Sequence, residues 1–184
     1  MAAMVWRCFS SAALAAALLL APAAASATPP SKAEVRQLLS GYEQTPGAAT
    51  WRTLGPEALS VLIALYDDPS EAPYVRLRAV HAAGFYPTPA TRTFLLAVAR
   101  APGQSDLFVR QAVLGLARAF GVRAVRDILP FLEHTEPVVR EGAAAGLGRI
   151  GSDDAREALR ARLVVERSDS VRLTIERSLS REVR

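Results

Sequence analysis

Hydrophobic residues recur along this chain in a repeat of about thirty residues, and each copy begins with a Val-Arg pair. The pairs stand at 75–76, 109–110, 139–140 and 171–172, separated by 34, 30 and 32 residues. Counted from the valine, apolar or small residues return at offsets 0, 4, 7, 8 and 11, which lie on one face of a helix with 3.6 residues per turn. Each copy therefore predicts an amphipathic helix that buries its first valine, namely Val75, Val109, Val139 and Val171.

A further amphipathic segment precedes each of these helices. Leucine, valine, isoleucine, phenylalanine or alanine recurs at helical spacing in 56–66, 89–100, 122–133 and 153–166. Pro56 and Pro89 suit a first helical turn, and short breaks at 67–69, 102–103 and 136–137 separate the two helices of a unit. No segment alternates apolar and polar residues over the length of a strand. The pattern predicts an all-α protein, an α-α superhelix (solenoid) of about four helical hairpins.

Upstream of the repeat, the sequence predicts one more short helix. Ser31 and Glu34 have the spacing of a capping box, and apolar residues follow at helical spacing: Val35, Leu38, Leu39 and Tyr42. We expect this helix to cover the first hairpin, with one more helical turn around Trp51 and Leu54. The chain is accordingly divided into 1–27, a capping helix and loop at 28–52, and the repeat domain at 53–184.

Residues 1–27 have the layout of a secretory signal peptide. One positive charge at Arg7 precedes an apolar run at 11–21, and Ala25-Ser26-Ala27 supplies the small residues that a signal peptidase requires. The apolar run is shorter than an ordinary transmembrane span. We predict cleavage after Ala27 and export to the periplasm or the extracellular space. The alternative is an uncleaved segment that tethers the protein to a membrane.

The third unit carries the most specific resemblance. Val139-Arg140, Ala143-Ala144 and the run at 147–151 resemble the short HEAT repeat of the phycocyanobilin lyase type, and the likeness extends over 53–184. The first unit departs from the pattern at 84–87, and the last ends in polar residues, as a terminal cap requires. The resemblance implies a right-handed superhelix whose second helices line the concave side. It does not imply lyase chemistry, because a repeat fold alone does not determine function.

The repeated arginines need a compensating charge, because a cation in the first turn of a helix opposes the helix dipole. We predict that they form ion pairs with acids in the preceding turns and so link adjacent units, similar to the Asp/Arg ladders of HEAT repeats. The predicted ladder comprises Arg76, Arg110, Arg140 and Arg172 with Asp106, Glu136 and Asp169, and with Glu71 or Asp68 as the partner of Arg76.

Composition and motifs argue against several kinds of chemistry. The net charge is only +4, and arginines alternate with acids as on a solvated helix face, which does not favour nucleic-acid binding. One cysteine and two histidines leave no zinc-binding pattern, and the G-x-G-x-x-G at 146–151 closes a helix instead of opening one. No nucleophile motif is present. We therefore predict no enzyme activity, no cofactor and no metal.

The face of the second helices opposite the core is the predicted binding surface. Its candidate protein-binding residues are Leu77, His81, Phe85, Gln111, Arg118, Glu141, Arg149 and Arg177. Arginine and aromatic residues are favoured in interfaces. We predict a non-enzymatic exported scaffold or adaptor that binds a protein or peptide partner. The alternatives are an accessory subunit of a modifying enzyme, similar to the bilin lyases, and a membrane-tethered structural protein.

Overall fold

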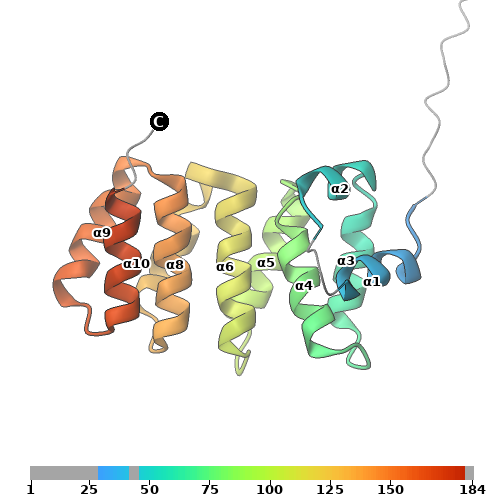
Figure 1. Cartoon of the computed structure of the whole chain (residues 1–184), viewed down its shortest axis with the longest axis horizontal. Helices are drawn as coiled ribbons and strands as arrows, with labels where there is room; N and C mark the ends of the chain where they lie inside the picture. The colour runs from blue at the N-terminus through green and yellow to red at the C-terminus, as the bar shows by residue number, and fades with distance from the viewer. Residues whose placement is uncertain (1–28, 42–45, 181–184) are drawn as a thin grey trace, which may run out of the picture.

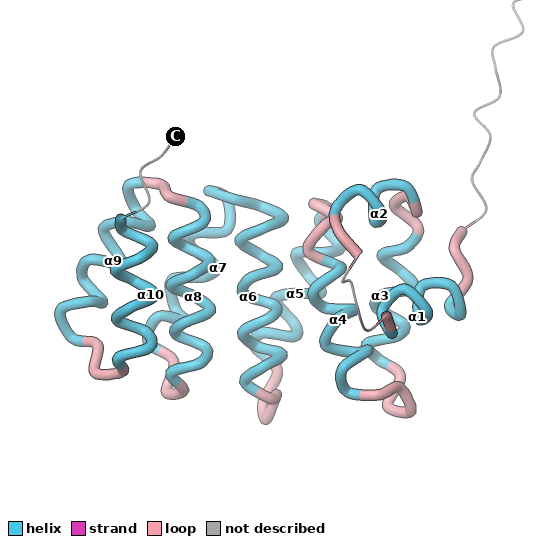
Figure 2. The backbone as a smooth tube through the Cα atoms, in the orientation of Figure 1, coloured by secondary structure: helices cyan, strands magenta, loops and turns pink. Residues whose placement is uncertain are grey.

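The computed structural model describes residues 29–41 and 46–180, and these residues form helices joined by short loops, with no strand among them (Figure 2). The elements in chain order are α1 (Lys32–Ser40), α2 (Ala48–Thr53), α3 (Ala58–Asp67), α4 (Pro73–Ala83), α5 (Pro89–Arg100), α6 (Asp106–Phe120), η1 (Gly121–Ala124), α7 (Val125–Ile128), η2 (Leu129–Glu133), α8 (Pro137–Ile150), α9 (Asp153–Val165) and α10 (Asp169–Ser180). The predicted signal peptide lies outside the described residues. No described helix is long and apolar enough to span a bilayer.

The second helices of the four units form one layer. Figure 1 shows α4, α6, α8 and α10 side by side in a row, each packed against the next, and we call this row the second-helix layer. The first helices α3, α5 and α9, and the segment η1–α7–η2, pack on the second helices of their own units. The predicted all-α architecture of stacked helix pairs is confirmed.

The four repeated valines sit in the core of this stack. Val75, Val109, Val139 and Val171 are all buried, the most exposed of them at 4%. Each is at the same place in the first turn of a second helix, so the 3.6-residue pattern turns the same side of every unit inward. A repeat that cannot bury its apolar face alone gains a continuous core from its neighbours.

The first helix of the third unit corrects a prediction. The segment 122–133 was expected to be one amphipathic helix, but it is a 3₁₀ turn, one α-helical turn and a second 3₁₀ turn. Pro130 lies at the start of η2, and proline has no N–H to donate to the preceding turn. The apolar side chains still face inward, because Val125, Ile128 and Leu132 are buried as their spacing predicts.

The N-terminal helix covers the first hairpin as expected. The Ser31 hydroxyl caps α1 by accepting the N–H of Glu34 at 3.1 Å, and Val35 and Leu39 are buried against α3 and α4. Trp51 on α2 is buried, and its backbone carbonyl accepts the Tyr86 hydroxyl at 2.7 Å. This buried hydrogen bond joins the N-terminal segment to the end of the first unit.

Small residues set the spacing within the second-helix layer. Gly115 and Gly148 lie between helices. A methyl group added at Gly84 would come within 2.9 Å of the Cα of Gly115, and one added at Gly148 would overlap Ser178 of α10. Backbones cross closely at these positions, so no side chain fits there.

Candidate functional site

Four of the predicted binding residues come together on α4, on the turn that follows it and on α6. The Gln111 amide lies 2.7 Å from Nδ1 of His81. Arg118 Nη1 lies 3.4 Å from His81 Nε2 and donates to the His81 backbone oxygen at 3.2 Å. We call His81, Phe85, Gln111 and Arg118 the face cluster. It joins the first unit to the second through polar contacts on the second-helix layer.

Aromatic contacts complete the face cluster. The Arg118 guanidinium lies over the Phe85 ring, 4.6 Å from its centroid, and the His81 ring meets Phe85 edge to face at 5.6 Å. A guanidinium over an aromatic face is stabilised by the ring quadrupole. The Arg118 side chain is thereby held by a carbonyl and a ring in one orientation.

The charged groups that act on the face cluster are all positive. Burial above all, and then the charges of Arg118 and Arg149, together lower the pKa of His81 to about 4. Burial also lowers the pKa of Arg118, and the charge of Arg149 adds to that effect. Arg149, on the last turn of α8, is exposed. At neutral pH the imidazole is therefore uncharged, and the two arginines repel each other.

The remaining predicted face residues are not linked to this cluster. Leu77 is half-buried, Glu141 forms an ion pair with Arg110 at 3.7 Å, and Arg177 is exposed on α10. Within 29–41 and 46–180, no hydrogen bond, ion pair or ring contact connects these three residues to the face cluster. Of the predicted binding residues, the structure thus brings only those of the face cluster into mutual contact, and Arg149 acts on them through its charge.

Two of the repeated arginines, Arg76 and Arg172, contact carbonyl groups at the ends of preceding helices. Arg76 Nε donates to the carbonyl of Tyr66 in α3 at 2.7 Å, and its guanidinium lies over the Tyr66 ring at 5.3 Å. Arg172 Nη1 donates to Leu163 of α9 at 3.1 Å and to the Glu166 carbonyl at 3.3 Å. The last carbonyls of a helix lack partners and carry partial negative charge. Each arginine therefore caps the first helix of its own hairpin.

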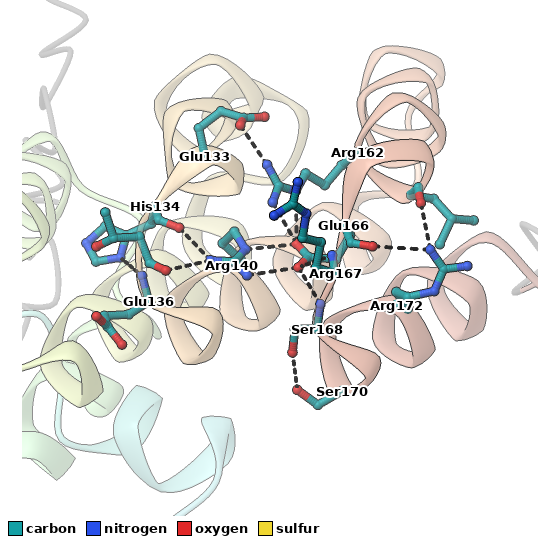
Figure 3. Close-up of polar contacts among 12 residues, drawn as sticks. Glu133, His134, Glu136, Arg140, Arg162, Glu166, Arg167, Ser168, Ser170 and Arg172 are labelled. Carbon is teal, nitrogen blue, oxygen red and sulfur yellow. Dashed lines mark hydrogen bonds and ion pairs between the residues drawn. The ribbon is translucent and has the colours of Figure 1, made fainter.

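Arg140 belongs to a buried ion network (Figure 3). Its guanidinium binds both Glu166 carboxylate oxygens, with Nε and Nη2 each at 2.8 Å, and Nη1 donates to the carbonyls of His134 and Thr135. Arg162 Nε donates to the same carboxylate at 2.9 Å, and its Nη1 donates to Glu133 at 2.6 Å. The Glu166 side chain has no exposed surface. The network joins η2 and α8 of the third unit to the end of α9 in the fourth.

Hydrogen bonding holds Glu166 in its charged form. The bond from Arg140 is the largest influence, and with the backbone N–H of Ser168 and the Arg162 side chain it outweighs burial. Together these groups lower the pKa of Glu166 to about 2. A bidentate arginine–carboxylate pair is among the strongest hydrogen-bonded contacts in proteins.

These contacts point to a known repeat family. Residues 103–180 match the family model of HEAT repeats. The HEAT match covers three of the four Val-Arg pairs and includes the whole Glu166 network. No curated protein matches the chain.

The acidic partners predicted for the repeated arginines are wrong. Among the described residues, Asp106, Glu136 and Asp169 form no ion pair with Arg110, Arg140 or Arg172. Asp68 and Glu71 instead bind the α1 residues Lys32 and Arg36, with Lys32–Asp68 at 2.5 Å and Arg36–Glu71 at 2.8 Å.

Two other carboxylates connect neighbouring units. Glu141 connects the second unit to the third through Arg110, and Glu166 connects the third to the fourth through Arg140. Glu166 stood at the end of the predicted segment 153–166, and nothing in the sequence marked it as the partner of an arginine 26 residues earlier.

The structure offers no metal-binding group among the residues it describes. Within them, no three His, Cys, Asp or Glu side chains are arranged to hold a metal ion.

Proposed function

We propose that this protein is a non-enzymatic scaffold or adaptor that binds another protein through the α4–α8 part of its second-helix layer. The face cluster is the observation that carries the proposal. Its arginine and aromatic side chains are held by contacts across two HEAT-like units before any partner arrives. Side chains ordered in advance reduce the entropy lost on binding. HEAT repeats are commonly interaction scaffolds, which agrees with this role.

Arginine and aromatic side chains also suit the energetics of an interface. Tyrosine, tryptophan and arginine dominate binding hot spots, and a guanidinium stacked on a ring presents both apolar area and fixed donors. Arg118 is half-buried and Arg149 is exposed, so a partner would contact one partly desolvated guanidinium and one solvated guanidinium. Such a pair favours a protein surface with complementary charge.

We further propose that the protein acts after export. The support is the signal-peptide layout of residues 1–27. N-terminal sequencing of the chain recovered from an exported fraction tests this. A chain that begins at Thr28 supports export with cleavage, a retained Met1 in a membrane fraction indicates a tether, and a chain found only inside the cell overturns export.

Crosslinking and pull-down with variants tests the binding face. Phe85→Ala combined with Arg149→Glu removes the ring and reverses the open charge, and we expect crosslinks to a recovered partner to fall at least tenfold. The matched control is Val122→Ala with Arg126→Glu, which makes equivalent changes at exposed positions in the other layer. Unchanged partner binding by the Phe85/Arg149 variant, with both proteins folded, overturns the proposed face.

A further inference from the structure

Among the described residues, Arg118 and Arg149 have no carboxylate partner, unlike the arginines in the first turns of α6, α8 and α10. Arg110, Arg140 and Arg172 of the second-helix layer each have a glutamate within 4.0 Å. In the described part of the chain, no ion pair includes Arg118 or Arg149. The bonds of Arg118 go to the His81 carbonyl and ring, which bring no negative charge.

Arg118 and Arg149 lie in the last turns of α6 and α8, two helices that pack against each other. The charge of Arg149 lowers the pKa of both Arg118 and His81, and no carboxylate acts on either group. Like charges beside a half-buried guanidinium cost free energy, because the protein interior screens less than water does. An anion placed between the two arginines would remove this repulsion and gain charge-assisted hydrogen bonds.

We propose that Arg118 and Arg149 bind a side-chain carboxylate in an acidic segment of the protein partner, and that Phe85 packs beside that segment. This inference rests on the proposed function and names the chemistry of the partner at the same face. Arg118 is already held by the His81 carbonyl and the Phe85 ring, so little further ordering is needed when the carboxylate arrives. Arg149 is exposed and supplies the open side of the site.

Charge complementarity favours an acidic protein segment over a polyanion. A nucleic-acid surface tracks many phosphates with a continuous basic stripe. On this layer Arg110, Arg140 and Arg172 are paired with glutamates. Arg76 and Arg78 are bonded to backbone carbonyls, so among the described residues the basic groups do not form a continuous stripe of open charge. In an extended peptide, one carboxylate could bind the two arginines while an apolar residue next to it packs on the aromatic ring.

The two histidines of the chain provide a built-in assay. His81 lies in the site, whereas His134 precedes α8 and contacts the backbone of Glu136. The full chain is titrated with a hexaglutamate peptide, with hexaglutamine as the neutral control and inorganic phosphate as the competing anion. The readout is the NMR signal of each imidazole Cε1–H at low salt. We expect hexaglutamate to move the His81 signal and to raise the pH at which it titrates, because a nearby anion favours the charged imidazole.

Matched variants separate a specific site from general attraction. Arg149→Gln should weaken hexaglutamate binding at least tenfold, since it removes one charge-assisted contact. Arg126→Gln, at an exposed position on α7, should change binding less than twofold. Neither side chain is needed for packing, so both variants should fold.

Three results would overturn the carboxylate site. One is equal weakening by the two variants, which would indicate net charge alone. Another is a hexaglutamate shift seen at His134 and not at His81. The third is phosphate binding as tightly as hexaglutamate at equal concentration, which would indicate a simple anion site. Loss of the carboxylate site with retained Phe85-dependent crosslinks would leave the proposed scaffold role standing, so the two proposals fail separately.

Discussion

Glu166→Gln is the substitution that most directly tests how the third and fourth units are held together. It keeps the shape of the side chain but removes the charge between Arg140 and Arg162. Breaking a buried ion pair by removing one partner costs about 3–5 kcal/mol, because the other charge stays buried without compensation. The pKa of Glu166, about 2 against an ordinary 4.5, independently corresponds to about 3 kcal/mol of folding free energy. We expect a loss of about 3 kcal/mol at pH 7.

Urea and thermal unfolding followed by circular dichroism at 222 nm measure this loss. For a chain of this size about 3 kcal/mol corresponds to a decrease in Tm of about 6–12 °C. The control is Glu176→Gln on α10, which removes a half-exposed partner 4.0 Å from Arg172 and should cost less than about 0.5 kcal/mol. The two variants lose the same charge from neighbouring elements.

The pH dependence of the Glu166→Gln effect has a fixed sign. A carboxyl group with a lowered pKa in the folded state stabilises the protein fully above its unfolded pKa of 4.5, and that contribution is lost as the pH falls toward 2. The difference between wild type and variant should therefore be largest at pH 6–7 and shrink below pH 4.5. A variant within about 0.5 kcal/mol of wild type at pH 7, or a difference that does not change with pH, would refute the assignment of Glu166 as the buried anion.

Three further predictions test other parts of the fold. The pKa of His81 is lowered from 6.5 to about 4 in the folded state, so the unfolded chain binds a proton first as the pH falls. Between pH 7 and pH 5, the free energy of unfolding of wild type should therefore fall by about 2 kcal/mol relative to that of His81→Gln. Equal pH profiles for the two proteins would contradict this. Gly148→Ala should destabilise the protein by about 1–3 kcal/mol, because the added methyl group would overlap Ser178. In urea unfolding, adding Ser178→Gly should restore part of this loss. No restoration would mean that the close contact between α8 and α10 is not the cause. Tyr86→Phe should lower the free energy of unfolding by about 1–2 kcal/mol, because it leaves the buried Trp51 carbonyl unpaired. An unchanged Tm in thermal unfolding would show that water reaches that carbonyl.

Part of the face cluster could be predicted from helical geometry alone. His81, Phe85, Gln111 and Arg118 share offsets opposite the core valines, so the repeat placed them on one face. Their mutual contacts depend on the close approach of α4 and α6 at Gly84 and Gly115. Helix spacing of that kind is a property of two packed surfaces, and a one-dimensional pattern does not contain it.

The acidic partners illustrate the opposite case. Sequence proximity suggested Asp106, Glu136 and Asp169, because an acid in the preceding turn can reach the first turn of a helix. Arg76 and Arg172 reach helix-end carbonyls instead, and Arg110 and Arg140 each pair with a glutamate of the following unit. Orphan carbonyls at a helix end are obligatory acceptors, so they compete with nearby carboxylates that water already solvates.

The apolar pattern of the sequence was enough to predict that the chain is helical, that its helices stack in pairs and that the four valines lie in the core. Those properties follow from the periodicity of apolar residues, which each segment carries locally. The packing of the units settles which carboxylates Arg110 and Arg140 bind, which glycines lie between helices, and that Arg118 and Arg149 lie on adjacent helices with no ion pair among the described residues. Those properties depend on the distances between units that are far apart in sequence, and such distances exist only once the helices have packed.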